Sequence, residues 1–337
     1  MQRVYVTGAA GFIGFHLSEL LLKEGLRVHG YDGMTAYYDL ALKRGRLAML
    51  HQREGFGFTQ AMLEDNARLA ADMAAFKPDV VVHLAAQAGV RYSLEAPRSY
   101  LSSNIEGTFN VMEAARDCGV KHLLLASTSS VYGANTEMPY RETDKADTQV
   151  SLYAATKKAT ESLSHSWAHL WGLPTTCFRF FTVYGPWGRP DMAPFKFTKA
   201  ILQGETIDVY GHGRMFRDFT YVTDLVRAIR LLMDKPPERP AAPDAIEEGD
   251  SLSPVAPWRV VNIGNGEKVA LGDFIAAIEK ATGRTAVRNL MEMQKGDVPA
   301  TWADNRLLTR LTGYRPETGI AAGMAAFVAW YREHYGV

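Results

Sequence analysis

The sequence has few cysteines, no excess of either charge and no long apolar run. Its two cysteines, Cys118 and Cys177, cannot build a disulfide framework, and no Cys/His cluster has zinc-site spacing. Thirty-seven basic and thirty-seven acidic residues give a formal charge of zero, so no global field directs the protein to nucleic acid or an anionic membrane. No run of about 18 apolar residues is free of charges and glycine clusters, and no signal peptide is recognisable. We expect no metal site, no nucleic-acid or membrane partner, and a cytoplasmic protein.

The first half of the chain alternates short apolar runs with longer helical patterns. Strands are predicted at residues 4–7, 27–31, 80–84, 123–127 and 175–180, and helices at 12–24, 66–76, 99–117 and 153–171. Strands that are apolar on both faces and separated by helices are typical of a parallel, doubly wound α/β sheet.

The composition changes after about residue 184, where turn-rich segments surround shorter elements. A strand is predicted at 260–263 and helices at 224–233, 271–282 and 319–335. We expect a nucleotide-binding domain of residues 1–183 plus about 216–263. A smaller, discontinuous substrate domain is expected from residues 184–215 plus about 264–337. The proline-rich stretch 235–257 should be an exposed loop, because its composition suits no packed core.

A glycine-rich turn follows the first predicted strand. Gly8, Gly11 and Gly14 leave room for the backbone to turn tightly, approach a pyrophosphate and pack the next helix on the strand. The start of that helix offers N–H donors and a partial positive charge. The second strand leads to Asp32, whose carboxylate suits ribose hydroxyls. No arginine follows it to bind a 2′-phosphate, so the pattern favours NAD over NADP.

A candidate acid–base group occupies the middle of the chain. Tyr153 and Lys157 are four residues apart and share one face of a predicted helix. Oxidation of an alcohol needs a base, and a neighbouring ammonium lowers the pKa of a phenol from its ordinary value of about 10. Thr128, at the end of the strand before this helix, can share the substrate hydroxyl's proton.

Together, the GxxGxxG turn, the sequence STSSVYG at 127–133 and the YxxxK pair resemble the extended short-chain dehydrogenase/reductase family, over nearly the whole chain. The resemblance implies a Rossmann-type fold, NAD as coenzyme and a catalytic triad of Thr128, Tyr153 and Lys157. It also implies a homodimer built on the predicted helices at 99–117 and 153–171. The coenzyme residues that it implies are Gly8, Gly11, Phe12, Ile13, Gly14, Asp32, Leu63, Leu84, Ala85, Ala86, Asn104, Tyr153 and Lys157.

One position departs from the family pattern. The third strand of family members usually ends in an aspartate directed to the adenine amino group, and Met62 stands there in this chain. We expect adenine to be held instead by backbone or by Asp65.

The second half of the chain resembles the family's nucleotide-sugar enzymes. Arg217, in the segment 211–222, matches a diphosphate contact, and Asp297, in Gly296-Asp297-Val298-Pro299, matches a segment that closes over the nucleotide. Within the family the chain most resembles the UDP-glucuronate 4-epimerases. This resemblance implies that a UDP-sugar is bound by Arg91, Ser129, Ser130, Thr182, Arg189, Arg217 and Asp297. Thr182 and Arg189 would then bind the C6 carboxylate.

The expected reaction is NAD-dependent C4 epimerisation of UDP-glucuronate to UDP-galacturonate through a transient 4-keto sugar. A UDP-glucuronate decarboxylase is disfavoured because Ser130 stands where such enzymes carry an acid. A UDP-glucose or UDP-N-acetylglucosamine 4-epimerase is disfavoured by Thr182 and Arg189. An NAD(H)-sensing binding protein on the same fold would not need the intact set of Thr128, Tyr153 and Lys157.

Overall fold

A parallel sheet forms the centre of the computed structural model, which describes residues 1–294 and 297–337. Within those residues the sheet has seven strands, in the order β11-β6-β5-β4-β1-β2-β3. They are β1 (Arg3–Thr7), β2 (Arg27–Asp32), β3 (Phe56–Gln60), β4 (Val80–His83), β5 (His122–Thr128), β6 (Thr175–Phe180) and β11 (Trp258–Ile263). All neighbouring strands pair in parallel, as a doubly wound sheet requires. The predicted fold class is confirmed.

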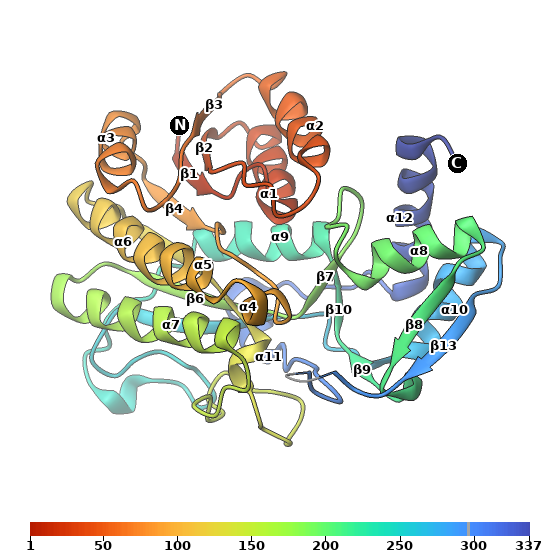
Figure 1. Cartoon of the computed structure of the whole chain (residues 1–337). Helices are drawn as coiled ribbons and strands as arrows, with labels where there is room; N and C mark the ends of the chain where they lie inside the picture. The colour runs from red at the N-terminus through yellow and green to blue at the C-terminus, as the bar shows by residue number, and fades with distance from the viewer. Residues whose placement is uncertain (295–296) are drawn as a thin grey trace.

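Helices cover both faces of this sheet (Figure 1). One layer contains α1 (Phe12–Lys23), α2 (Leu40–His51), α9 (Val222–Met233) and α11 (Arg306–Thr312); the other contains α3 (Asn66–Phe76), α6 (Gly107–Asp117) and α7 (Leu152–Trp171). Successive side chains of β1 point to opposite faces of the sheet. Val4 and Val6 pack against the first layer, and Tyr5 packs against the second.

A third hydrophobic core lies away from α3, α6 and α7, on the right of Figure 1. It is built on α8 (Ala193–Gln203), α10 (Leu271–Thr282), α12 (Ile320–Tyr335) and β8 (Thr206–Tyr210), which pairs with β13 (Val287–Met291). Short strands β7 (Thr182–Tyr184) and β10 (Phe219–Tyr221) pair next to it, as do β9 (Phe216–Arg217) and β12 (Val269–Ala270). The domain boundaries remain a prediction.

The predicted helix at 99–117 is wrong in detail, because it is broken into three pieces. They are α5 (Pro97–Tyr100), a π-helix (Leu101–Glu106) and α6. Single π-turns inside helices are frequent at functional sites. A short helix α4 (Tyr92–Glu95) precedes them, and a 3₁₀ turn (Ser129–Tyr132) follows β5. Across residues 1–294 and 297–337, no helix has the length and apolar character that a bilayer crossing requires.

Candidate active site

A cavity of about 1010 Å³ opens at the carboxyl ends of the central strands, where ligands of open α/β sheets bind. The predicted coenzyme residues that line it are Gly8, Gly11, Phe12, Ile13, Gly14, Asp32, Leu63, Leu84, Ala85, Ala86, Tyr153 and Lys157. Thr128 and the predicted substrate residues Arg91, Ser129, Ser130, Thr182, Arg189, Arg217 and Asp297 also line it. Residues as far apart in the sequence as Gly8 and Asp297 therefore meet in one space large enough for a dinucleotide and a nucleotide sugar.

The glycine turn has the form of a phosphate cradle. Gly8 has a φ of 73°, and a Cβ there would lie 2.8 Å from the backbone nitrogen of Ala85. A Cβ on Gly14 would overlap the carbonyl oxygen of Gly8. Gly11 is the N-cap of α1 and has no side chain to occupy the N–H groups of the first turn, and the residues from Gly11 to Gly14 line the cavity. These features fit the pyrophosphate of a dinucleotide.

Asp32 ends β2 and is fixed by two backbone donors. Its Oδ2 accepts from the N–H of Ala10 at 3.1 Å, and its Oδ1 accepts from the N–H of Met34 at 2.7 Å. The carboxylate keeps further lone pairs for ribose hydroxyls, so the residues present fit NAD.

Thr128, Tyr153 and Lys157 come together across β5 and α7. Lys157 is buried and donates from Nζ to the carbonyl oxygen of Ala126 at 2.8 Å, two residues before Thr128. Thr128 Oγ1 accepts from the N–H of Ser130 and also lies 3.2 Å from Ser130 Oγ. Ser151 caps the start of α7 and fixes Tyr153 in its first turn. The geometry places a phenol, an ammonium and a hydroxyl on one wall.

The pKa shifts in this group differ from the prediction that Lys157 lowers the pKa of Tyr153. Burial raises the pKa of Tyr153, and the opposing influences are a hydrogen bond with Thr128 and the charge of Arg189. Burial also lowers the pKa of Lys157 to about 8. Ionisation of the phenol therefore needs further positive charge, which an oxidised nicotinamide ring supplies.

Asn104 is not among the described residues that line the cavity, so its contact with the coenzyme stays a prediction, while its hydrogen bonds fit the family's asparagine that steadies the central sheet. Its side chain accepts from the N–H of Gln87 at 2.8 Å and donates to the carbonyl oxygen of Gln87 at 3.0 Å. Its amide also donates to Thr156 Oγ1, next to Lys157, at 3.1 Å. Asn104 lies on the π-helix and links two parts of the structure: Gln87, on the cavity wall after β4, and Thr156 of α7.

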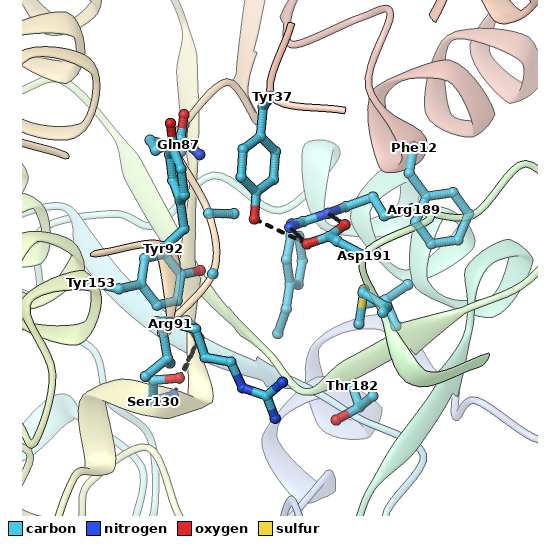
Figure 2. A pocket seen from close by; sticks show the side chains of 18 of the residues that line it. Phe12, Tyr37, Gln87, Arg91, Tyr92, Ser130, Tyr153, Thr182, Arg189 and Asp191 are labelled. Carbon is cyan, nitrogen blue, oxygen red and sulfur yellow. Dashed lines mark hydrogen bonds and ion pairs between the residues drawn. The ribbon is translucent and has the colours of Figure 1, made fainter. Parts of the chain in front are cut away.

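Arg189 is not a free cation. Its Nη2 and Nε lie 2.6 and 3.0 Å from the two carboxylate oxygens of Asp191, and the hydroxyl of Tyr37 donates to Asp191 at 3.0 Å (Figure 2). The pKa of Asp191 is lowered by Arg189 despite burial. No sequence motif indicates Asp191 or Tyr37. The charge of Arg189, which was expected to face only the substrate carboxylate, is already paired with Asp191.

Arg217 and Asp297 also form an ion pair, at 2.7 Å, and Arg217 donates to the carbonyl oxygen of Val298 at 2.8 Å. Gly296 of the same motif lies outside the described residues. Arg91 is different: Figure 2 shows its side chain directed into the cavity, and it forms no ion pair with the part of the chain described. Its guanidinium carbon lies over the Tyr210 ring, 4.9 Å from the ring centroid.

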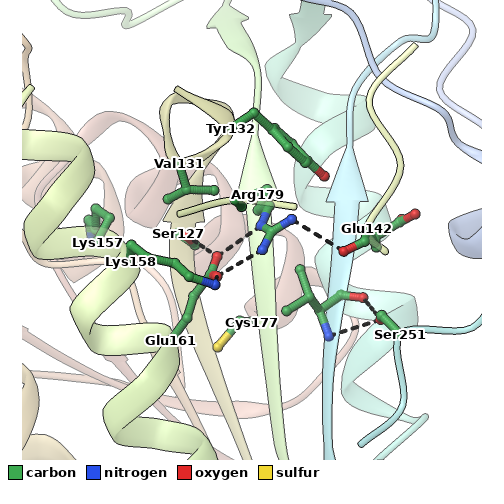
Figure 3. A network of polar contacts seen from close by, with 12 residues as sticks. Ser127, Val131, Tyr132, Glu142, Lys157, Lys158, Glu161, Cys177, Arg179 and Ser251 are labelled. Atoms are coloured by element: carbon green, nitrogen blue, oxygen red, sulfur yellow. Dashed lines mark hydrogen bonds and ion pairs between the residues drawn. The ribbon is translucent and has the colours of Figure 1, made fainter. Parts of the chain in front are cut away.

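A buried polar network lies next to the wall that carries Thr128 and Lys157 (Figure 3). Arg179 donates to both carboxylate oxygens of Glu161 at 2.9 Å. Ser127, next to Thr128, donates to Glu161 at 2.6 Å, and Lys158, next to Lys157, donates to it at 3.2 Å. This network joins β5, β6 and α7 at the level of the triad, and no motif in the sequence indicates it.

Arg46 of α2 is fully buried and joins two parts of the cavity. It donates to the carbonyl oxygen of Ala10 in the glycine turn at 3.0 Å and to that of Trp187 at 2.6 Å. The segment containing Trp187 leads to Arg189. Arg46 therefore fixes the coenzyme turn relative to the predicted substrate segment.

The chain resembles known proteins over its whole length. Residues 4–245 match the model of the NAD dependent epimerase/dehydratase family. The chain belongs to this family. It is 54% identical to a probable UDP-glucuronate 4-epimerase of Rhizobium meliloti (strain 1021), over 99% of this chain and 98% of that protein.

Solved structures agree on the architecture. The UDP-glucuronic acid 4-epimerase from Bacillus cereus, in complex with UDP-glucuronic acid and NAD, superposes with a TM-score of 0.85 at 31% identity, covering 99% of this chain and 100% of that one. DesIV, a dTDP-glucose 4,6-dehydratase from Streptomyces venezuelae, reaches a TM-score of 0.86 at 26% identity, covering 99% and 98%. Similar backbones thus serve different reactions, and side chains in the cavity must distinguish them.

Proposed function

We propose that this protein is an NAD-dependent UDP-glucuronate 4-epimerase that forms UDP-galacturonate. The observation that carries the proposal is the meeting of the glycine turn, Thr128, Tyr153 and Lys157 in one cavity with Ser129, Ser130, Thr182 and Arg189. The high identity to a probable enzyme of that name supports the choice of substrate.

In the proposed reaction, Tyr153 as phenolate removes the proton of the sugar's C4 hydroxyl, with Thr128 sharing that proton. NAD, when bound, would supply the acceptor for the C4 hydride and would later return that hydride, so the reaction has no net redox change. We propose that the Lys157 ammonium adds to the influence of Thr128 and Arg189 in stabilising the phenolate. Between the two transfers, Arg217 holds the diphosphate while the 4-keto sugar ring turns over in the cavity, so that the hydride would return to the opposite face of C4. The proton then returns from Tyr153 to the inverted alkoxide.

The 4-keto uronate is a β-keto acid, which loses CO₂ when its carboxylate bond aligns with the ketone π system. We propose that Ser129, Thr182 and Arg189 hold the carboxylate away from that alignment. The hydroxyls donate hydrogen bonds, and the Arg189 fork is held in one orientation by Asp191. The serines at 129 and 130 are poor proton donors compared with a carboxylic acid, which favours reversible epimerisation over decarboxylation.

Product analysis tests this function. The purified protein would be incubated separately with UDP-glucuronate, UDP-glucose and UDP-N-acetylglucosamine, and the sugars identified by NMR. We expect UDP-galacturonate from the first and little turnover of the others. UDP-pentose as the main product would indicate a decarboxylase, and UDP-galactose a UDP-glucose epimerase. Turnover lost in Tyr153→Phe but present in the wild type distinguishes an enzyme from an NAD(H)-sensing protein.

A homodimer is part of the proposal. Phe109 of α6 packs against Trp167 of α7 at 5.2 Å between ring centroids, and Trp171 at the end of α7 is 47% exposed. Aromatic surface on neighbouring helices suits a partner helix pair. Analytical ultracentrifugation of the wild type and of Trp171→Glu would test the homodimer. We expect the wild type to sediment as a dimer and the variant as a monomer. The cytoplasm remains the predicted compartment.

A further inference from the structure

The adenine end of the cavity lacks the family's usual acid. A Cβ built on Gly33 would collide with the Met62 thioether, so Met62 lies directly beside Gly33, the residue after the aspartate expected to hold the adenosine ribose. Met62, Leu63 and Glu64 all line this end of the cavity. Adenine bound by a chain with the proposed function would face these residues.

Neither Met62 nor Asp65 suits the amino group of adenine. A thioether is only a weak hydrogen-bond acceptor, and the Met62 side chain is 40% exposed. Asp65 is the N-cap of α3, where its Oδ1 accepts from the N–H of Arg68 at 3.1 Å, and it is not among the described residues that line the cavity. The expectation that Asp65 holds adenine is therefore not supported by the geometry.

Glu64 has the missing acceptor. One of its carboxylate oxygens accepts from the hydroxyl of Ser103 at 3.1 Å. The other, Oε2, is buried and has no hydrogen-bond partner among residues 1–294 and 297–337. Buried carboxylate oxygens are rarely left without a donor in folded proteins, and an unpaired one is unfavourable. The unpaired oxygen belongs to a side chain on the cavity wall, so a ligand can supply the donor after a small rotation of the carboxylate.

We propose that Glu64 accepts a hydrogen bond from the exocyclic amino group of adenine and so selects adenine dinucleotides, replacing the aspartate that Met62 displaces. Ionised carboxylates only accept hydrogen bonds, and an amino group only donates at this position. A purine with a 6-oxo group would place an oxygen lone pair against the carboxylate and be rejected. Ser103 lies on the π-helix that also carries Asn104, so this helix orients both the adenine contact and the cavity wall.

Binding of two dinucleotides tests this proposal without any turnover. The full-length protein, freed of bound nucleotide, would be titrated calorimetrically with NAD and with nicotinamide hypoxanthine dinucleotide, which carries the 6-oxo group. We expect the wild type to bind NAD at least about 10-fold more tightly. Glu64→Ala should reduce this ratio to about 1, chiefly by weakening NAD. Glu64→Gln, which keeps the shape and an acceptor for Ser103, should reduce it to below about 3-fold.

Glu106→Gln is the matched control, because it removes the same charge from an exposed position on the π-helix that carries Ser103. Its binding ratio should equal that of the wild type. The proposal is overturned if the wild type binds both dinucleotides equally, or if Glu64→Gln keeps the full ratio. In either case, turnover of UDP-glucuronate by the wild type would leave the proposed function intact. A wild type that binds neither dinucleotide would overturn both.

Discussion

Arg189 and Asp191 face each other as a two-point ion pair inside the cavity, with nitrogen–oxygen distances of 2.6 and 3.0 Å. The pair is held by Tyr37, whose hydroxyl donates to Asp191. A uronate carboxylate would thus meet an arginine whose orientation is fixed and whose charge is already shared. Selectivity at this position would then come from the geometry of the guanidinium fork more than from net charge.

The first prediction concerns loss of this arginine. Arg189→Ala should raise the KM for UDP-glucuronate by about tenfold, because a charge-assisted contact is lost. It should also release CO₂ and UDP-pentose, because the keto acid is less restrained. Both are measured by NMR of the reaction mixture. An unchanged KM with no pentose would show that Arg189 does not hold the carboxylate.

Asp191→Asn provides the opposing test. It keeps the shape of the side chain and removes the charge that Arg189 shares, so we expect the KM for UDP-glucuronate to fall a few-fold. The KM for UDP-glucose, which has no carboxylate, should stay unchanged. If both variants weakened both substrates alike, the pair would serve only the local fold.

The second prediction concerns Arg46. Arg46→Met should lower the stability of the fold by about 3 kcal/mol, because it leaves buried carbonyl oxygens of the glycine turn and the Trp187 segment without donors. It should also weaken NAD binding. Arg44→Met is the control, since Arg44 is exposed on the same helix. Thermal unfolding and calorimetry measure both effects, and equal behaviour of the two variants would contradict the linking role.

The third prediction concerns Lys157 and pH. Because its pKa is lowered to about 8 from the ordinary 10.5, the unfolded chain binds more protons than the folded one between these values. The free energy of unfolding therefore increases with pH in this window. Below pH 8 the fold carries the full cost of burying the charged ammonium. Lys157→Met should be inactive yet melt a few degrees higher than the wild type at pH 7. The difference should shrink by pH 9.5; a constant difference would contradict the shift.

The fourth prediction concerns Glu142, whose pKa burial raises to about 7. The folded chain here binds more protons than the unfolded one between pH 4.5 and about 7, so this contribution to stability is lost as the pH rises through that window. Glu142→Gln still accepts a hydrogen bond from the N–H of Asn262. Its melting temperature should be higher than that of the wild type at pH 8 and equal to it at pH 4.5. Matching melting temperatures at pH 8 would refute the shift.

The central sheet could be predicted because its strands are buried on both faces and so form continuous apolar runs. The strand at 175–180 begins and ends where β6 does. The helix α2 and the edge strand β3 were not predicted. Lys43 and Arg46 are among the buried residues of α2, so its inner face lacks the apolar periodicity on which prediction depends. Thr59 is the only buried residue of β3, and it is polar, so the strand gives no continuous apolar run.

Motifs in the sequence identify the residues of the site, but they do not show which of the charged side chains form ion pairs with one another. Sequence spacing places Arg189 and Arg217 in the cavity, whereas their pairing with Asp191 and Asp297 depends on side-chain geometry. The position of Asn104 behind the wall likewise follows from the π-helix, which inserts one extra residue in a turn. The roles of the site residues remain predictions.

The most direct test uses UDP-glucuronate that carries deuterium at C4. If Tyr153 and NAD oxidise and reduce this carbon, the UDP-galacturonate formed must retain deuterium at C4 when the reaction runs in ordinary water. Product that carries protium at C4, with its label released into the solvent, would contradict the account.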